Sequence, residues 1–214
     1  MPYMALEGVR VVDMACGIAG SFCSKLLGQY GAEVLKIESA GTQFASSTPL
    51  SLYLDAGKKS ISINIHRGNG IDVLRQLIAH CNVVIEDSPP GTMQTLGLGY
   101  ENLRSLRSDL ILTSVTPFGQ TGPHKNYTYT ELTMFAMSGA MYREGIPGRE
   151  PLKYGGELSQ YFAGNAAAAV TAAAIFRVAM QGKGDWIDIS IQECMAGHPH
   201  QIGRRAPYAY ASQI

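Results

Sequence analysis

Short apolar runs alternate with stretches of helical periodicity along most of the chain. Residues 9–14 form an apolar run that predicts a buried strand, and residues 33–38 form another. Between them, residues 21–30 carry apolar side chains at helical spacing, and Gly31 stands where a glycine commonly ends a helix. A strand, a helix and a second strand in this order are the unit of a parallel sheet with right-handed crossovers.

The same alternation continues as far as residue 191. The further strands that the pattern predicts are residues 59–65, 82–86, 110–115 and 186–191. The further predicted helices are residues 70–80, 93–98, 100–106, 130–141 and 160–181. Residues 142–154 predict a loop because they are rich in glycine and proline, and residues 197–214 show no clear periodicity. We therefore predict an α/β fold with a Rossmann-like open parallel sheet flanked by helices.

Composition and charge argue against several classes of partner. Hydrophobic residues make up 46% of the chain and charged residues 16%, as in a soluble globular domain. Lysine plus arginine (17) balance aspartate plus glutamate (17), so we do not expect the basic surface that nucleic acid requires. The N-terminus lacks the pattern of a signal peptide, and the longest apolar stretch, residues 166–176, is too short to span a bilayer. We expect a cytoplasmic protein without a membrane or nucleic-acid partner.

Metal-ligand and hydrolase motifs are not found in the sequence. The four cysteines are scattered without CxxC spacing, which is typical of reduced thiols in a cytoplasmic protein. His198 and His200 are closely spaced, but their alternation around Pro199 does not suit a chelating helix. Neither a Ser-His-Asp order nor a GxSxG motif occurs. We therefore expect no metal site.

Two glycine-containing loops are candidate ligand sites. The first is Gly17-Ile18-Ala19-Gly20, which follows a predicted strand and opens a helix, where backbone N–H groups can hold a phosphate or a carboxylate. It does not match the GxGxxG fingerprint of dinucleotide-binding proteins. The second, residues 118–123, follows a strand at the sheet edge where ligands bind in open α/β folds. A plain turn is the simpler explanation of the first loop and explains the second equally well. Taken together, the residues indicate an α/β domain and favour ligand binding.

Several segments, taken in order along the chain, resemble the motifs of the family III CoA-transferases. This is the group of formyl-CoA transferase, carnitine CoA-transferase and α-methylacyl-CoA racemase. The matching segments are Leu6–Asp13, Gly31–Glu38, Gly57–Asn64, Asn82–Gly91, Leu96–Tyr100, Phe118–Pro123 and Gly182–Ser190. The resemblance implies that residues 1–196 are the amino-terminal part of the family's large domain. It also implies that residues 197–214 form the connection toward a second domain.

The resemblance further implies reversible transfer of CoA between carboxylic acids through an aspartate nucleophile, with acyl-CoA as substrate. In the family this aspartate stands four residues before the glycine that opens the alanine-rich helix. That glycine is Gly164 here, so the position is occupied by Gln160, whose carboxamide cannot act as the nucleophile. Glu157 and Asp87 are the carboxylates that could substitute, provided that the backbone brings one of them into place.

The resemblance also implies a set of CoA-binding positions. They are Gly17, Ile18, Ala19, Ile63, His66, Asp87, Ser88, Gly119 and Gln120. Some of these depart from the family pattern, since His66 replaces a lysine and Asp87-Ser88 replaces Asn-Phe. Thr95, outside this set, replaces an arginine of the family. Loss of cationic donors should weaken the hold on the phosphates of CoA, because charge-assisted hydrogen bonds are the strong ones.

Three hypotheses follow. The protein could be an active CoA-transferase with an unusual nucleophile, or a non-catalytic subunit that pairs with an active paralogue. The altered residues at the nucleophile and CoA positions favour the second. In either case the resemblance implies a homodimer, or a heterodimer with a longer CoA-transferase subunit, acting on a small carboxylic acid. A non-enzymatic structural module, or one that binds an acid or a nucleotide, is disfavoured because the motifs occur in order.

Overall fold

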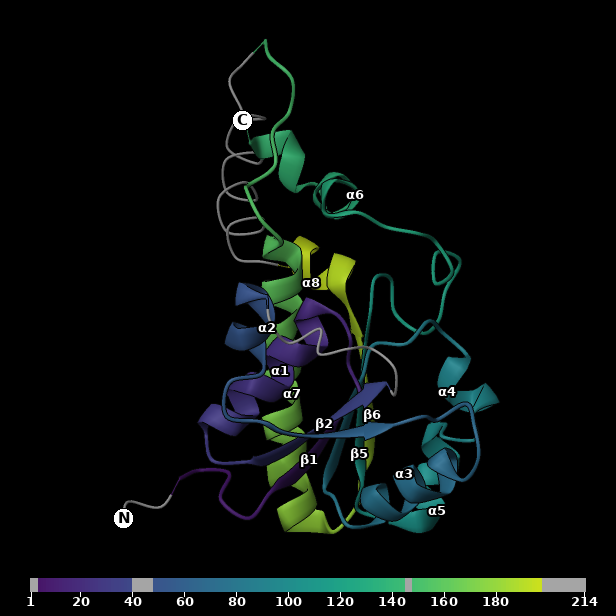
Figure 1. Ribbon diagram of the computed structural model, residues 1–214. Helices are drawn as coiled ribbons and strands as arrows, with labels where there is room; N and C mark the ends of the chain where they lie inside the picture. The colour runs from purple at the N-terminus through teal and green to yellow at the C-terminus, as the bar shows by residue number, and fades with distance from the viewer. Residues whose placement is uncertain (1–3, 40–47, 145–147, 198–214) are drawn as a thin grey trace.

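The computed structural model describes residues 4–39, 48–144 and 148–197 (Figure 1). Its centre is a six-stranded sheet in which all neighbouring strands are parallel. The strands are β1 (Arg10–Asp13), β2 (Glu33–Ser39), β3 (Lys59–Ile63), β4 (Val83–Glu86), β5 (Ile111–Thr116) and β6 (Asp185–Ser190). The predicted Rossmann-like open parallel sheet is confirmed, and each strand lies within one or two residues of its predicted range.

Helices flank both faces of the sheet (Figure 1). The helices of the described residues are α1 (Ile18–Gln29), α2 (Pro49–Leu54), α3 (Gly70–Ala79), α4 (Thr92–Thr95), α5 (Tyr100–Leu106), α6 (Glu131–Met137), α7 (Leu158–Gln181) and α8 (Ile191–Ala196), with a 3-10 helix, η2 (Ala140–Arg143). Helices α1 and α7 pack on one face, and α3 and α5 pack on the other. The domain therefore has three layers.

The central strands are buried on both faces, which explains their continuous apolar sequences. On β1, Val11 belongs to the core beneath α1 and α7, whereas its neighbour Val12 belongs to the core beneath α3 and α5. On β4, Ile85 and Val84 divide in the same way. Successive side chains of a strand point to opposite faces, so a strand with both faces covered is mostly apolar at consecutive positions.

The strand order is β3-β2-β1-β4-β5-β6. Strands β2 and β3 lie on one side of β1. The chain then crosses to the other side of β1, where it forms β4, β5 and β6. In open α/β sheets a ligand crevice forms where the order reverses, outside the carboxyl ends of the strands. The fold therefore directs attention to the segments that follow β1 and β4.

Helices α1 and α7 approach each other closely through small residues. A Cβ atom added at Gly164 of α7 would lie 2.6 Å from the carbonyl oxygen of Ala19 on α1 and 3.1 Å from Phe22. No side chain fits at that distance, so the glycine is required by the packing. Helix α7 is also long and apolar enough to cross a membrane by length and composition, a property that core helices share. Here its buried face packs on α1 and the sheet.

Three local features differ from the sequence prediction. The predicted helix over residues 130–141 is interrupted because Gly139 has a φ of +79°, which ends α6 and begins η2. Helix α2 was not predicted, because it is too short to give a clear helical periodicity. Its N-cap is Thr48, whose side chain accepts a hydrogen bond from the Ser51 N–H. Helix α8 follows β6 directly, with Ser190 as its N-cap, so the apolar pattern of the strand extends into the helix without a break.

We predict that Gly164→Ala lowers the free energy of unfolding by about 2 kcal/mol, because the added methyl group overpacks the contact between α1 and α7. The exposed helix neighbour provides the control: Asn165→Ala should raise stability by about 0.5 kcal/mol through helix propensity. Urea denaturation of the two variants measures both effects. If Gly164→Ala were as stabilising as an ordinary glycine-to-alanine change in a helix, the close contact would be disproved.

Candidate active site

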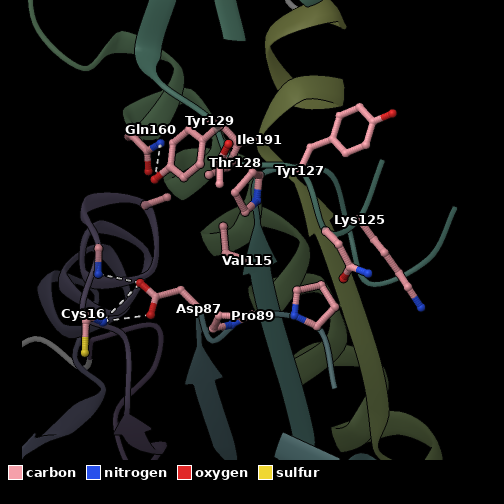
Figure 2. Close-up of a pocket in the computed structure, with 15 residues that line it drawn as sticks. Cys16, Asp87, Pro89, Val115, Lys125, Tyr127, Thr128, Tyr129, Gln160 and Ile191 are labelled. Carbon is pink, nitrogen blue, oxygen red and sulfur yellow. Dashed lines mark hydrogen bonds between the residues drawn. The ribbon is translucent and has the colours of Figure 1, made fainter. Parts of the chain in front are cut away.

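A cavity of about 470 Å³ lies beyond the carboxyl ends of β1, β4 and β5 (Figure 2). Its walls come from the β1–α1 loop, the segment after β4, the loop after β5, the first turn of α7 and the start of α8. The strand order reverses between β1 and β4, so we call it the switch-point cavity. Its polar wall residues include Cys16, Asp87, Lys125, Thr128, Tyr129 and Gln160.

The carboxylate of Asp87 binds the amino end of α1. Its Oδ2 accepts hydrogen bonds from the backbone N–H of Gly17 at 2.6 Å and of Cys16 at 3.1 Å, and its Oδ1 accepts from Cys16 at 2.9 Å. Gly17 is the N-cap of α1 and Cys16 precedes it, and the helix dipole favours a negative charge there. Burial nevertheless holds the pKa of Asp87 above its ordinary value, with the two N–H groups acting in the opposite direction.

A buried ion network holds the β1–α1 loop in place from below. Asp13, fully buried at the end of β1, accepts from Lys58 Nζ at 2.9 Å and from Lys36 Nζ at 3.4 Å. Lys36 also donates to the carbonyl oxygen of Ala15 at 2.5 Å and to Ser21 Oγ at 3.0 Å. The network therefore ties β1, β2 and the start of α1 together. The amide groups that bind Asp87 are fixed by the fold.

Gln160 faces the same cavity from the first turn of α7. The residue is 5% exposed, and its Nε2 donates to the Tyr129 hydroxyl at 3.4 Å. The preceding residue, Ser159, donates from both its N–H and its hydroxyl to the buried carboxylate of Glu131, which fixes the start of the helix. The position that the family resemblance assigns to the nucleophile thus points into the cavity, with a neutral side chain.

Tyr129 connects the two sides of the cavity electrostatically. Burial raises the pKa of its hydroxyl, the hydrogen bond from Gln160 acts against this, and the carboxylate of Asp87 raises it further. Figure 2 shows Tyr129 beside Gln160, with Asp87 below them in this view. Asp87, Tyr129 and Gln160 therefore belong to one site.

The structure brings together four of the residues that the sequence assigned to the site. Gly17, Ala19, Asp87 and Gln160 all line the switch-point cavity. Ile18 lines a neighbouring cavity of about 440 Å³ between α1, β2 and α2. The two cavities share Cys16 and Gly17, so the β1–α1 loop separates them.

The remaining assigned residues lie outside the switch-point cavity. Ile63 is buried at the end of β3, and the backbone N–H of His66 donates to the side chain of Asn64. The backbone N–H of Ser88 donates to Glu86, and that of Gln120 donates to both carboxylate oxygens of Asp188 at 3.0 Å. Gly119 lines a separate polar cavity of about 230 Å³.

Glu157 is exposed at the N-cap of α7 and does not line the switch-point cavity. Of the two carboxylates that the sequence offered as substitutes for the missing aspartate, the fold therefore brings Asp87 into the cavity and leaves Glu157 at the surface.

One wall of the cavity has no counterpart in the sequence prediction. Residues 125–129, in the loop between β5 and α6, close the side opposite α1. Part of the loop is held by contacts of the Tyr127 ring, which meets Phe118 edge to face and lies tilted against His124. A loop without periodicity gives no signal of where it lies, although its two tyrosines within three residues could have suggested a binding surface.

In the described part of the chain, no group of three or more histidine, cysteine, aspartate or glutamate side chains is placed to hold a metal ion. His198 and His200, weighed above as a metal pair, lie outside the described residues.

Comparison with known proteins agrees with the fold. The model of CoA-transferase family III matches residues 6–201, so the chain belongs to this family. It is 33% identical over 202 residues to succinyl-CoA–D-citramalate CoA-transferase of Chloroflexus aurantiacus, covering 90% of this chain and 50% of that protein. It is also 33% identical to the beta subunit of succinyl-CoA–L-malate CoA-transferase of the same organism, covering 89% and 50%.

A solved structure of a CAIB/BAIF family protein from Brucella suis superposes with a TM-score of 0.89 and 30% sequence identity. The match covers 99% of this chain and 59% of that structure. The chain spans about half the length of the relatives that it matches. Family membership and the Rossmann-like fold are thereby established, and they agree with the resemblance read from the motifs.

We predict that Asp87→Asn speeds alkylation of Cys16 by iodoacetamide at pH 8 by about threefold. The pKa of the Cys16 thiol is raised first by burial and then by the negative charge of Asp87, so removal of that charge increases the thiolate fraction. Peptide mass spectrometry would measure the rate at Cys16 itself. Asp72→Asn, an equal charge change on the exposed side of α3, should leave the rate unchanged; an equal effect of both variants would contradict the assignment.

Proposed function

We propose that the protein transfers CoA between an acyl-CoA and a small carboxylic acid. The observation that supports this most is the switch-point cavity itself. The amino end of α1, the carboxylate of Asp87 and the family's nucleophile position at Gln160 all face it. The transfer of an acyl group needs a carboxylate near the thioester and donors for the oxyanion that forms, and both kinds of group stand there.

For the acids, we propose small dicarboxylic acids and their CoA thioesters. The relatives named above are a succinyl-CoA–D-citramalate and a succinyl-CoA–L-malate transferase, so their substrates are small dicarboxylic acids. A cavity of about 470 Å³ lies within the usual range for small-molecule sites. The same cavity has room for the acyl group and the thioester end of CoA.

We propose that the CoA chain runs from the switch-point cavity along the carboxyl edge of the sheet. Ile63 is the last residue of β3, and His66 follows that strand. Ser88 comes just after β4. All three residues therefore stand at the carboxyl edge of the sheet, where an open α/β fold binds its ligand. Gly119 and Gln120 stand at the same edge, after β5. On this proposal the protein works in the cytoplasm and as a dimer.

A second candidate is a non-catalytic subunit that pairs with an active, longer homologue. Gln160 favours it, because the neutral carboxamide faces the cavity at the nucleophile position. The relative named a beta subunit shows that family members assemble from different subunits. Such a subunit would bind CoA or its partner without transferring the acyl group.

The proposed function predicts that Thr128→Trp weakens binding of succinyl-CoA about tenfold or more. Thr128 is an exposed loop residue in the cavity wall, so a tryptophan can be accommodated by the fold but fills the binding space. Isothermal titration calorimetry on the purified chain measures the affinity. Ser105→Trp, on the exposed face of α5, is the control and should bind like the unmodified protein. No binding of succinyl-CoA by the unmodified chain would refute the proposed function.

A further inference from the structure

Asp87 is the carboxylate in the wall of the switch-point cavity. Among the described residues that line it, no other aspartate or glutamate is present. Two other carboxylates near the start of α7 are engaged or exposed elsewhere: Glu131 accepts two hydrogen bonds from Ser159, and Glu157 is exposed. A reaction at a carboxylate inside this cavity therefore has one candidate within the described chain.

The two oxygens of Asp87 are held differently. Oδ2 accepts from two backbone N–H groups, those of Gly17 and Cys16, whereas Oδ1 accepts only from Cys16. Oδ1 therefore keeps more of its lone-pair density for attack on an electrophile. Oδ2 is already seated between two donors at 2.6 and 3.1 Å.

We propose that Asp87 is the covalent nucleophile of the transfer reaction, in place of the carboxylate that position 160 lacks. The inference rests on the proposed function, because it requires that an acyl-CoA enters the cavity. The atom that attacks is Oδ1 of Asp87.

The steps balance without an added oxidant or proton. Oδ1 attacks the thioester carbon of the donor, the C–S bond breaks, CoA leaves as thiolate, and a mixed anhydride with Asp87 forms. The thiolate then attacks Cγ of Asp87, the anhydride C–O bond breaks, and the donor acid leaves as carboxylate. The acceptor carboxylate attacks the resulting Asp87 thioester at Cγ and expels the thiolate. Finally the thiolate attacks the acceptor acyl carbon, which frees Asp87 and releases the new acyl-CoA.

The amino end of α1 is placed to stabilise these steps. When a thiolate or a carboxylate attacks Cγ, the negative charge of the tetrahedral intermediate develops on the oxygen that is not in the breaking bond, which is Oδ2. The N–H groups of Gly17 and Cys16 already point at Oδ2 and need no rearrangement. Preorganised donors at a developing oxyanion are among the largest contributions to acyl-transfer catalysis.

The environment of Asp87 also favours attack. Burial raises the pKa of its carboxyl group, and a more basic carboxylate is a stronger nucleophile. The charged groups that act on it are Asp13, which raises the pKa further, and Lys36, which lowers it. Both belong to the network beneath the β1–α1 loop, so the charge balance around Asp87 is built into the fold.

The test uses the purified full chain and succinyl-CoA. After incubation, borohydride reduces any acyl-enzyme at its activated carboxyl group, and peptide mass spectrometry locates the resulting alcohol. We expect the modification at Asp87. Exchange of labelled succinate into succinyl-CoA should fall about a thousandfold or more in Asp87→Asn. It should persist in the matched control Glu157→Gln, which alters an exposed carboxylate outside the cavity.

A second variant keeps the carboxylate and moves it. A Cβ atom at position 17 would lie 2.9 Å from Asp87 Oδ2, so Gly17→Ala displaces the carboxylate from its donors. Gly17 has a φ of −89°, which alanine adopts without strain. We expect this variant to lower the exchange rate while Asp87 remains present.

Three outcomes overturn the inference. Exchange by the unmodified chain with the modification at another carboxylate, or exchange unaffected by Asp87→Asn, would assign the reaction elsewhere and leave the proposed function standing. Binding of succinyl-CoA without exchange or modification would show that Asp87 does not react and would favour the non-catalytic subunit. Because the unmodified chain is mapped directly, a variant that fails to fold does not weaken the test.

Discussion

The hydrogen bonds from the amino end of α1 to the carboxylate of Asp87 are the interaction on which the site depends. They join the segments that follow β1 and β4, which lie some 70 residues apart in sequence and meet because the strand order reverses between these strands. Without this contact the cavity would have neither its carboxylate nor its oriented donors. The fold thus places a negative charge where a helix dipole stabilises it and where a ligand crevice is expected.

The position of Asp87 is stabilised by the residues that pack around the β1–α1 loop. A carboxylate withdrawn from water is unfavourable unless it is hydrogen-bonded, and the half-buried Asp87 is held by two backbone donors that the network of Asp13, Lys36 and Lys58 keeps in place. On the other side, Gly164 allows α7 to approach α1 so closely that Gln160 reaches the same cavity. The site therefore depends on a charge network below and a close helix contact beside it.

Much of this could be predicted from the sequence, and the reasons for the rest are physical. The strands and long helices follow from local apolar patterns, and the ordered motifs indicated the family. Gly164 and Gln160 were placed correctly at the start of the long helix. The contact of Asp87 with Gly17 could not be predicted, because it depends on strand order. The wall formed by residues 125–129 could not be predicted either, because a loop without periodicity carries no information on its path.

The chain has the fold of its family, and we propose that Gln160 stands at the family's nucleophile position and that Asp87 supplies the carboxylate that Gln160 lacks. The most direct measurement is the fate of oxygen during turnover with succinate labelled by ¹⁸O in its carboxylates. If Asp87 is the nucleophile, the acceptor oxygen that attacks Cγ remains on Asp87, and peptide mass spectrometry will find ¹⁸O in its carboxylate. Turnover that leaves Asp87 unlabelled would contradict the account.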